Sequence, residues 1–250
     1  MLTSLTTGFI ARLRSNDQAA WFELWETFGP VVRSQLAKWG RGRIGSETVR
    51  DLSQETLAAL SGSINRYDPG RGARFSTWLL AIAKHVLGDE MDRRTAQKRG
   101  GNRKRGDFDE SWMTAAATQS VDAQYEAAVF GAKVEAAIRL VERETEFTDF
   151  GIFRMRIFDG RSGKDVAAAL GISEPTVSRR LARVRDRLRA RLSEVISTYS
   201  FTEDELQEAE RNGLSLNPTK ADDDLFDEAV AEIYHRQQEL RRRDQGARLE

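Results

Sequence analysis

Residues 46–94 contain two consecutive helical patterns joined by a turn signal, and this arrangement leaves few choices of fold. Apolar residues at helical spacing are Val49, Leu52, Leu60 and Ile64 in the first pattern and Phe75, Leu79, Ile82 and Val86 in the second. Between them stands Tyr67-Asp68-Pro69-Gly70, where proline presets φ and glycine accepts a positive φ. The pattern predicts two helices, the first capped by Ser46, whose apolar faces pack together.

The polar faces of these two predicted helices carry different chemistry. On the first helix, Asp51, Gln54 and Glu55 cluster opposite the apolar face. The polar side of the second helix carries Lys84, His85 and Asp92, with the small residues Ala81 and Gly88 beside them. Carboxylates are ordinary on a solvated helix face, so a functional interpretation rests on the order of the parts: an acidic helix, an aromatic loop and a basic helix.

Three motifs in this order resemble the polymerase-binding and minus-ten-reading domain of bacterial sigma factors, specifically the extracytoplasmic-function (ECF) group. They are DLSQET, YDPGRGARFSTWL and AIAKHVLGDEMDRR, which together are far more specific than any one short motif. The resemblance implies that Asp51, Gln54 and Glu55 bind a coiled-coil clamp of the largest subunit of core RNA polymerase. Charged groups there would steer association and fix register.

The resemblance also implies a minus-ten site. Tyr67, Phe75 and Trp78 lie around the loop where the family holds a base flipped out of the non-template strand, and aromatic rings suit stacking on any base. Packing in the core is the alternative, which we favour for Phe75 but not for Trp78. The other minus-ten candidates are Lys84, His85, Asp92 and Arg93. His85 stands where the family commonly has Asn, so the base preference does not transfer, and a solvated surface histidine is the alternative.

Residues 161–192 predict a helix-turn-helix. Gly171 permits the turn, Ser173 can cap the second helix, and Pro175 falls in its first turn. The buried side of that helix is predicted to be Val177, Leu181, Val184, Leu188 and Leu192. The residues predicted to bind DNA in a major groove are Ser173, Thr176, Arg179, Arg180, Arg183 and Arg187.

The same block resembles the minus-thirty-five-reading domain of sigma factors. It contains nine basic residues and three acidic ones, an excess of six, so affinity for DNA should fall steeply with salt. An arginine-rich solvated helix is the alternative. The family often opens this domain with a Leu-Pro helix start, which is absent here, so the bounds of the preceding helix stay open.

Charge is distributed unevenly along the chain, although the formal net charge is zero. Residues 201–250 hold 14 acids and 7 bases, which leaves 25 acids and 32 bases upstream, so nucleic-acid binding is predicted for the upstream part. With no Cys and two distant histidines, neither a Cys–His pair nor a zinc cluster can be assembled, and we expect neither an enzyme nor a cofactor. No apolar run is long enough to span a bilayer, and a cytoplasmic location is expected.

The predicted fold is all-α, with two small helical domains joined by a flexible basic linker. The predicted parts are a sigma domain two-like unit at 1–95, the linker at 96–120, a sigma domain four-like helix-turn-helix unit at 121–200 and an acidic helical extension at 201–250. In the extension, Thr202-Glu203-Asp204-Glu205 fits a capping box, Gly213 would end the short helix that follows, and 222–243 form a second helix. We expect the extension to dock on the helix-turn-helix domain and to tune promoter or polymerase binding; a partly solvated appendage is the alternative.

These features favour a sigma-type initiation factor that binds core RNA polymerase, recognises the minus-thirty-five and minus-ten elements of promoter DNA and promotes duplex opening. A stand-alone helix-turn-helix regulator is the alternative, but it leaves the acidic helix and aromatic loop unexplained. An anti-sigma factor or a regulatory kinase is a further candidate partner, which the sequence does not identify.

Overall fold

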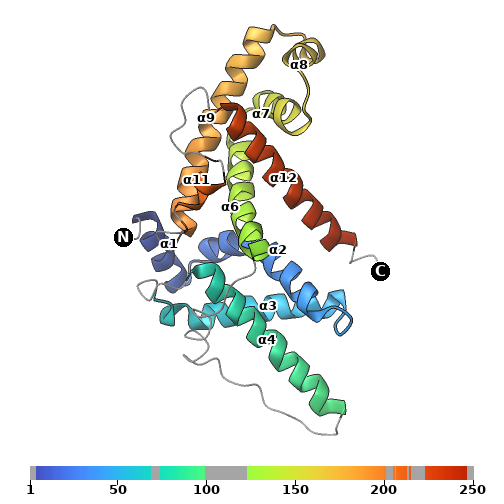
Figure 1. The fold of residues 1–250 in the computed structure, drawn as a ribbon. Coiled ribbons are helices and arrows are strands. Elements are labelled where there is room, and N and C mark those ends of the chain that lie inside the picture. Colours follow the sequence, from blue (N-terminus) through green and yellow to red (C-terminus); the bar gives the residue numbers. More distant parts are fainter. Residues whose placement is uncertain are drawn as a thin grey trace. The chain divides into compact units, whose positions relative to one another are not determined.

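The computed structural model describes residues 4–68, 74–98, 123–200, 205, 207–212, 214 and 223–246, and every regular element within them is a helix (Figure 1). The all-α prediction is therefore confirmed for this part of the chain. The helices fall into two compact units. The first contains Met1–Val129, Ser200–Thr202 and Leu240–Glu250, and the second contains Phe130–Tyr199 and Glu203–Glu239.

The first unit is built from α1 (Ser4–Arg14), α2 (Gln18–Gly40), α3 (Ser46–Ser63), a 3-10 turn (Ile64–Arg66), α4 (Phe75–Lys98) and the start of α6 (Ala123–Glu144). Asp17 caps α2, because its Oδ1 accepts hydrogen bonds from the amides of Ala19 (2.9 Å) and Ala20 (3.2 Å). The N-cap of α3 differs from the prediction: it is Gly45, which has no side chain to offer, and Ser46 is already the first helical residue.

Helices α3 and α4 form the predicted pair, and all eight apolar residues that the spacing assigned to their shared core are buried. The start of α6 belongs to the same unit. There, the hydroxyl of Tyr125 donates to the carbonyl of Ser76 (2.9 Å), and the carboxylate of Glu126 pairs with Arg74 (2.8 Å). These two contacts hold the first turn of α4 in place.

Several predictions fall on residues outside the described ranges. Of the predicted turn at 67–70, the structure describes the first two residues but not Pro69 and Gly70. Helix α4 runs to Lys98, so the first three residues of the predicted linker are helical, and the rest of the linker lies outside the described residues. The same holds for residues 202–204 of the predicted capping box and for Gly213.

The second unit is built from the rest of α6, α7 (Phe147–Phe153), a π-helical stretch (Arg154–Phe158), α8 (Gly163–Leu170), α9 (Glu174–Tyr199), α11 (Glu208–Arg211) and most of α12 (Asp223–Gly246). The helix-turn-helix prediction is confirmed for α8 and α9. Gly171 ends α8 in the left-handed conformation, at φ 64° and ψ 32°, and Ser173 lies directly before α9. The five apolar residues predicted on the inner side of α9 are all buried.

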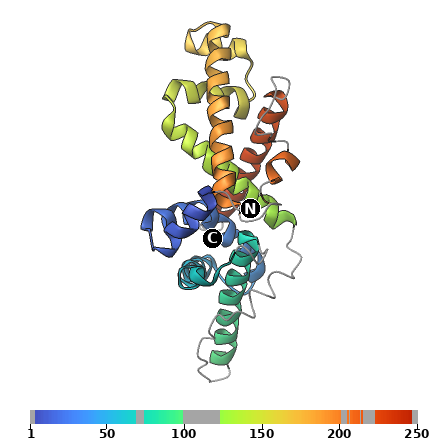
Figure 2. The same cartoon turned by 90° about the vertical axis from the view of Figure 1, so that its left-hand side faces the viewer.

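In the second unit, the described part of α12 up to Glu239 packs against α9 and the π-helical stretch (Figure 2). The ring of Tyr234 in α12 stacks on Phe158, with centroids 3.8 Å apart and planes 5° apart. Next to it, Nε2 of His235 lies 3.1 Å from the carbonyl oxygen of Phe158. Phe226 and Val230 of α12 are also buried. Helix α12 of the extension thus contacts the second unit, while docking of the whole extension and its effect on promoter or polymerase binding stay predictions.

Candidate nucleic-acid interface

The predicted clamp-binding residues lie on one accessible strip of α3. Asp51 and Gln54 are exposed and Glu55 is half-buried, whereas Leu52 is buried beneath them. Hydrogen bonding to Glu90 raises the pKa of Arg93 on α4, and the negative charge of Glu55 adds to that effect. The acidic strip is thus open to a partner along α3 and lies within electrostatic reach of the basic end of α4.

Helix α4 presents only part of its predicted DNA-binding set to solvent. The exposed members are Lys84, Asp92 and Arg93. The ammonium nitrogen of Lys84 lies 5.8 Å from the ring centroid of Trp39, which orients it by a cation–π contact. His85 is only 9% exposed, and its Nε2 lies 3.6 Å from Oδ2 of Asp89. The solvated-surface alternative for His85 is therefore wrong, and a base contact requires its ring to turn away from Asp89.

The aromatic residues beside the loop form a packed cluster. Tyr67, Phe75 and Trp78 are each no more than 2% exposed. The rings of Tyr67 and Trp78 stack with centroids 4.7 Å apart, and Phe75 meets Trp78 edge-on at 5.8 Å. Core packing is confirmed for Phe75. In this structure Trp78 packs in the same way, contrary to the preference for base contact, so stacking on a base requires Tyr67 or Trp78 to leave the cluster.

The indole of Trp78 also carries an unsatisfied polar group. Its Nε1 is buried and has no hydrogen-bond partner among the described residues. A buried donor without a partner costs about 1–3 kcal/mol. That cost lowers the free energy needed to move Trp78 out of the cluster.

The residues predicted to enter the major groove lie on one side of α9. Their side chains contact different partners, and these contacts differ in length. Nη2 of Arg179 lies 3.4 Å from the hydroxyl of Thr176, which is 2.9 Å from the hydroxyl of Ser173. Arg187 donates to the carbonyl of Glu144 (3.0 Å) and so caps the C-terminal end of α6. Arg179 is therefore the more loosely held of these two arginines.

Arg180 and Arg183 share the carboxylate of Asp149, a residue in the first turn of α7. Oδ1 of Asp149 accepts a hydrogen bond from Nη1 of Arg180 at 3.0 Å, and Oδ2 lies 3.2 Å from Nη2 of Arg183. Asp149 is 8% exposed. Sequence reasoning missed this residue because the bounds of the helix before the helix-turn-helix were left open.

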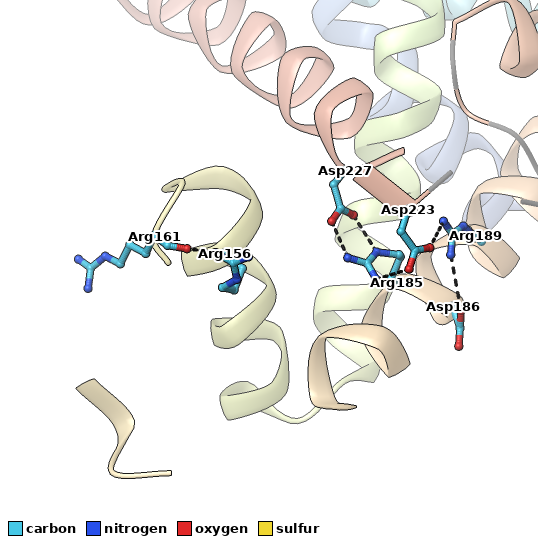
Figure 3. Close-up of polar contacts among 7 residues, drawn as sticks. All are labelled: Arg156, Arg161, Arg185, Asp186, Arg189, Asp223 and Asp227. Atoms are coloured by element: carbon cyan, nitrogen blue, oxygen red, sulfur yellow. Dashed lines mark hydrogen bonds and ion pairs between the residues drawn. The ribbon is translucent and has the colours of Figure 1, made fainter. Parts of the chain in front are cut away.

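Two further arginines of α9 lie on another side of the helix, buried against α12 (Figure 3). The guanidinium of Arg185 spans Asp223 and Asp227, with N–O distances from 2.6 to 2.9 Å. Arg189 pairs with Asp223 at 2.7 Å and lies 4.4 Å from the ring centroid of Phe226. Burial alone would lower the pKa of Arg185, but the hydrogen bond and charge of Asp227 and the charge of Asp223 hold it above its usual value.

A third buried cation of this unit also meets the extension. Lys133 of α6 is 1% exposed, and its Nζ lies 3.6 Å from Oε2 of Glu208 in α11. Arg185 and Arg189 belonged to the basic excess counted in the sequence, and here they hold the extension instead. The charge available to DNA on α9 is therefore smaller than the excess of six indicates. The acidic surplus of residues 201–250 was a sequence signal for these contacts.

The acidic strip and aromatic cluster of one unit and the helix-turn-helix of the other both fall within a match to known proteins. A family model described as ECF sigma factor matches residues 6–194. The chain belongs to the ECF sigma factor family. It is 31% identical over 140 residues to the ECF RNA polymerase sigma factor SigC of Mycobacterium tuberculosis, which covers 56% of this chain and 68% of that protein. It is 26% identical over 194 residues to the ECF RNA polymerase sigma factor RpoE of Cereibacter sphaeroides, which covers 75% of this chain and 96% of that protein.

Membership in the ECF sigma factor family makes this chain a transcription initiation factor for RNA polymerase rather than an enzyme, with core RNA polymerase and promoter DNA as the implied partners. The resemblance seen in the sequence motifs is confirmed. The family match ends at residue 194, so α11 and α12 lie beyond it. None of the described helices combines the length and apolar composition that crossing a membrane requires.

Proposed function

We propose that this ECF sigma factor reads the minus-thirty-five element with the exposed side of α9 and the minus-ten element with α4, and that it promotes opening of the duplex. The acidic strip of α3 binds the coiled-coil clamp of core polymerase. The observation that carries the proposal is the family match across 6–194, because it includes the α3–α4 pair as well as the helix-turn-helix. The exposure of Asp51, Gln54, Arg179 and Arg183 supports it.

Each DNA-binding surface in this proposal is small. On α9, Arg185 and Arg189 are held by the extension, and on α4 His85 is buried, so each unit offers few contacts to DNA. Two linked weak sites bind more strongly together when their spacing lets both engage at once, and this gain falls as the linker lengthens. We expect core polymerase to fix that spacing, so the free chain should bind promoter DNA weakly at physiological salt.

Opening of the duplex requires a place for an extruded base. The rings of Tyr67 and Trp78 are stacked on each other, and the buried indole donor of Trp78 lacks a partner among the described residues. An extruded base could replace one ring as the stacking partner of the other, at about 1–3 kcal/mol of stacking free energy per base. This exchange would couple base capture to a rearrangement at the start of α4.

The stand-alone regulator accounts for α8 and α9 but gives no role to the acidic strip of α3. The two hypotheses differ in their need for polymerase. A regulator should bind its operator without core polymerase, whereas this sigma factor should produce defined transcripts only with it.

Run-off transcription with bacterial core polymerase on a pool of genomic promoter fragments tests the proposal. The decisive variant is Asp51→Arg/Glu55→Arg, which reverses two charges one helical turn apart. Glu228→Arg/Glu232→Arg is the matched control, since it reverses two exposed charges at the same spacing on α12. We expect defined transcripts with the wild type and the control, and at least a tenfold loss with the α3 variant, which corresponds to about 1.4 kcal/mol of binding free energy.

Two results would count against the proposal. If the α3 variant transcribed as well as the control, the clamp contact would lie elsewhere. If the wild type produced no transcripts but bound an operator tightly by itself, the stand-alone regulator would be the better account.

A further inference from the structure

Asp149 joins two residues of the predicted DNA-reading side of α9 through one carboxylate. Its Oδ1 accepts from Nη1 of Arg180 (3.0 Å), and its Oδ2 pairs with Nη2 of Arg183 (3.2 Å). The two arginines are three residues apart, so they lie side by side on the helix surface. The carboxylate comes from a different helix, α7, which packs against α9. The direction of both guanidinium groups is thus set by the packing of the unit.

The two arginines are unequal in exposure. The side chain of Arg180 is 31% exposed, and that of Arg183 is 68% exposed. Arg180 is therefore the more buried of the two partners of Asp149. Arg183 projects toward solvent, and only its Nη2 contacts the carboxylate. A guanidinium has five N–H donors in a rigid fork, and a bidentate contact to O6 and N7 of guanine uses two of them. Arg183 keeps enough donors for that contact.

Arg179 shows what the same side of α9 looks like without a carboxylate. It is exposed, and its Nη2 makes a long contact of 3.4 Å to the Thr176 hydroxyl. Such a side chain adds positive charge near DNA but is not oriented in advance. Holding a side chain in its bound conformation lowers the entropy lost on binding. Arg183 is thus better prepared than Arg179 to distinguish one base pair from another.

We propose that Asp149 is a positioning residue that holds Arg183 for a bidentate contact to a guanine in the upstream promoter element. This inference rests on the proposed function, because it requires α9 to enter a major groove. It gives Asp149 two opposite effects. Its charge weakens the attraction of the arginines for phosphates at any sequence, while its geometry strengthens the contact at one base pair.

These opposite effects separate positioning from a structural role. Asp149→Asn removes the charge and one acceptor at nearly unchanged volume. We expect sequence-independent binding to rise about twofold, and the preference for guanine at one base pair to fall roughly fivefold, which is the lower end of what one bidentate contact contributes. A residue that only stabilised α7 would lower both together and leave the preference unchanged.

The test uses the full chain with core polymerase and a promoter library in which every base occurs at each upstream position. Asp149→Asn is compared with Arg183→Lys, which keeps the charge but loses the fork. Asp165→Asn is the matched control, because Asp165 is an exposed carboxylate of α8 whose described contacts are with Ser162. Thermal unfolding of each variant, followed by circular dichroism, shows whether it is folded at the assay temperature.

The expected result is that Asp149→Asn and Arg183→Lys lose preference at the same base pair, while Asp165→Asn retains it. Full wild-type preference in Asp149→Asn, with transcription intact, would overturn the inference and leave the proposed function standing. A wild type that transcribes with no upstream guanine preference would also overturn it. A wild type that gives no polymerase-dependent transcripts would overturn the proposed function and this inference with it.

Discussion

Helix α9 carries arginines on two sides, and the two sides have opposite environments. Arg179 and Arg183 are exposed, whereas Arg185 and Arg189 are 8% and 9% exposed and face the aspartates of α12. All four have the same chemistry and lie within eleven residues. The difference shows that the number of basic residues in a helix does not tell how many of them can contact DNA. The carboxylates that tertiary packing places beside each arginine decide which ones a nucleic acid can reach.

The two sides also differ in what their ion pairs contribute to stability. An exposed pair contributes about 0–1 kcal/mol, because water and salt screen it. A buried pair adds little net stability over apolar residues, but removing one partner leaves an uncompensated charge and costs about 3–5 kcal/mol. Breaking a contact on the α12 side should therefore affect folding, and breaking one on the exposed side should affect binding.

The largest effect is expected from Asp227→Ala. This change leaves the buried Arg185 with Asp223 as its remaining ion-pair partner and with the charge of the neighbouring Asp224, so the free energy of unfolding of the second unit should fall by about 2–4 kcal/mol. Denaturant unfolding followed by far-ultraviolet circular dichroism measures it. The described tryptophans, Trp21, Trp25, Trp39 and Trp78, all belong to the first unit, so tryptophan fluorescence should change little.

Asp224→Ala is the control for this change, since Asp224 is the exposed neighbour on α12 and should cost no more than about 0.5 kcal/mol. The double variant Arg185→Met/Asp227→Leu should recover most of the loss, because it removes both buried charges together. Equal destabilisation by Asp227→Ala and Asp224→Ala would show that the α12 side is not a buried ion-pair interface.

An intermediate effect is expected on the salt dependence of promoter binding by the holoenzyme. Arg179→Ala should reduce the slope of log affinity against log salt by about one, as for the loss of one phosphate contact. Arg185→Met/Asp227→Leu should leave that slope unchanged. Binding measured across a range of salt concentrations compares the two variants. If the slope fell only in Arg185→Met/Asp227→Leu, the buried side of α9 rather than its exposed side would be the one that contacts DNA.

The smallest effect concerns Glu90, which pairs with Arg93 and Arg94 near the end of α4 in the first unit. Hydrogen bonding to Arg93, and then to Arg94, lowers the pKa of Glu90 below its usual value of 4.5. The stability this provides is present above the unfolded pKa and is lost as pH falls through the lowered folded pKa. In Glu90→Gln, the free energy of unfolding should therefore fall less steeply with pH below about pH 4.5 than in the wild type. Denaturant unfolding at each pH, followed by tryptophan fluorescence, measures it. An unchanged acid profile would mean that these hydrogen bonds add no stability.

The local parts of the fold were predictable from the sequence. Gly171 and Pro175 mark the end of one helix and the start of the next through their own backbone restrictions, and the apolar spacing of α3, α4 and α9 identified the buried side of each helix. The predicted N-cap of α3 was wrong by one residue. Such features depend on neighbours close in the sequence.

The parts that escaped prediction depend on partners far along the chain. The burial of Arg185 is set by Asp227, 42 residues later, and the orientation of Arg183 by Asp149 in a helix whose bounds had no clear signal. Trp78 was assigned to a base because an aromatic ring near a loop suits stacking as well as packing, and spacing does not separate the two. The roles of the individual site residues stay predictions until they are measured.

Promoter-specific transcription by holoenzymes carrying Arg183→Ala or Arg185→Met/Asp227→Leu tests the central claim most directly. The account predicts that the first variant loses transcription that depends on the upstream element, by about tenfold for one lost base contact, while the second transcribes like the wild type. The opposite pattern, with Arg183→Ala active and the α12-side variant inactive though folded, would contradict the assignment of DNA reading to the exposed side of α9.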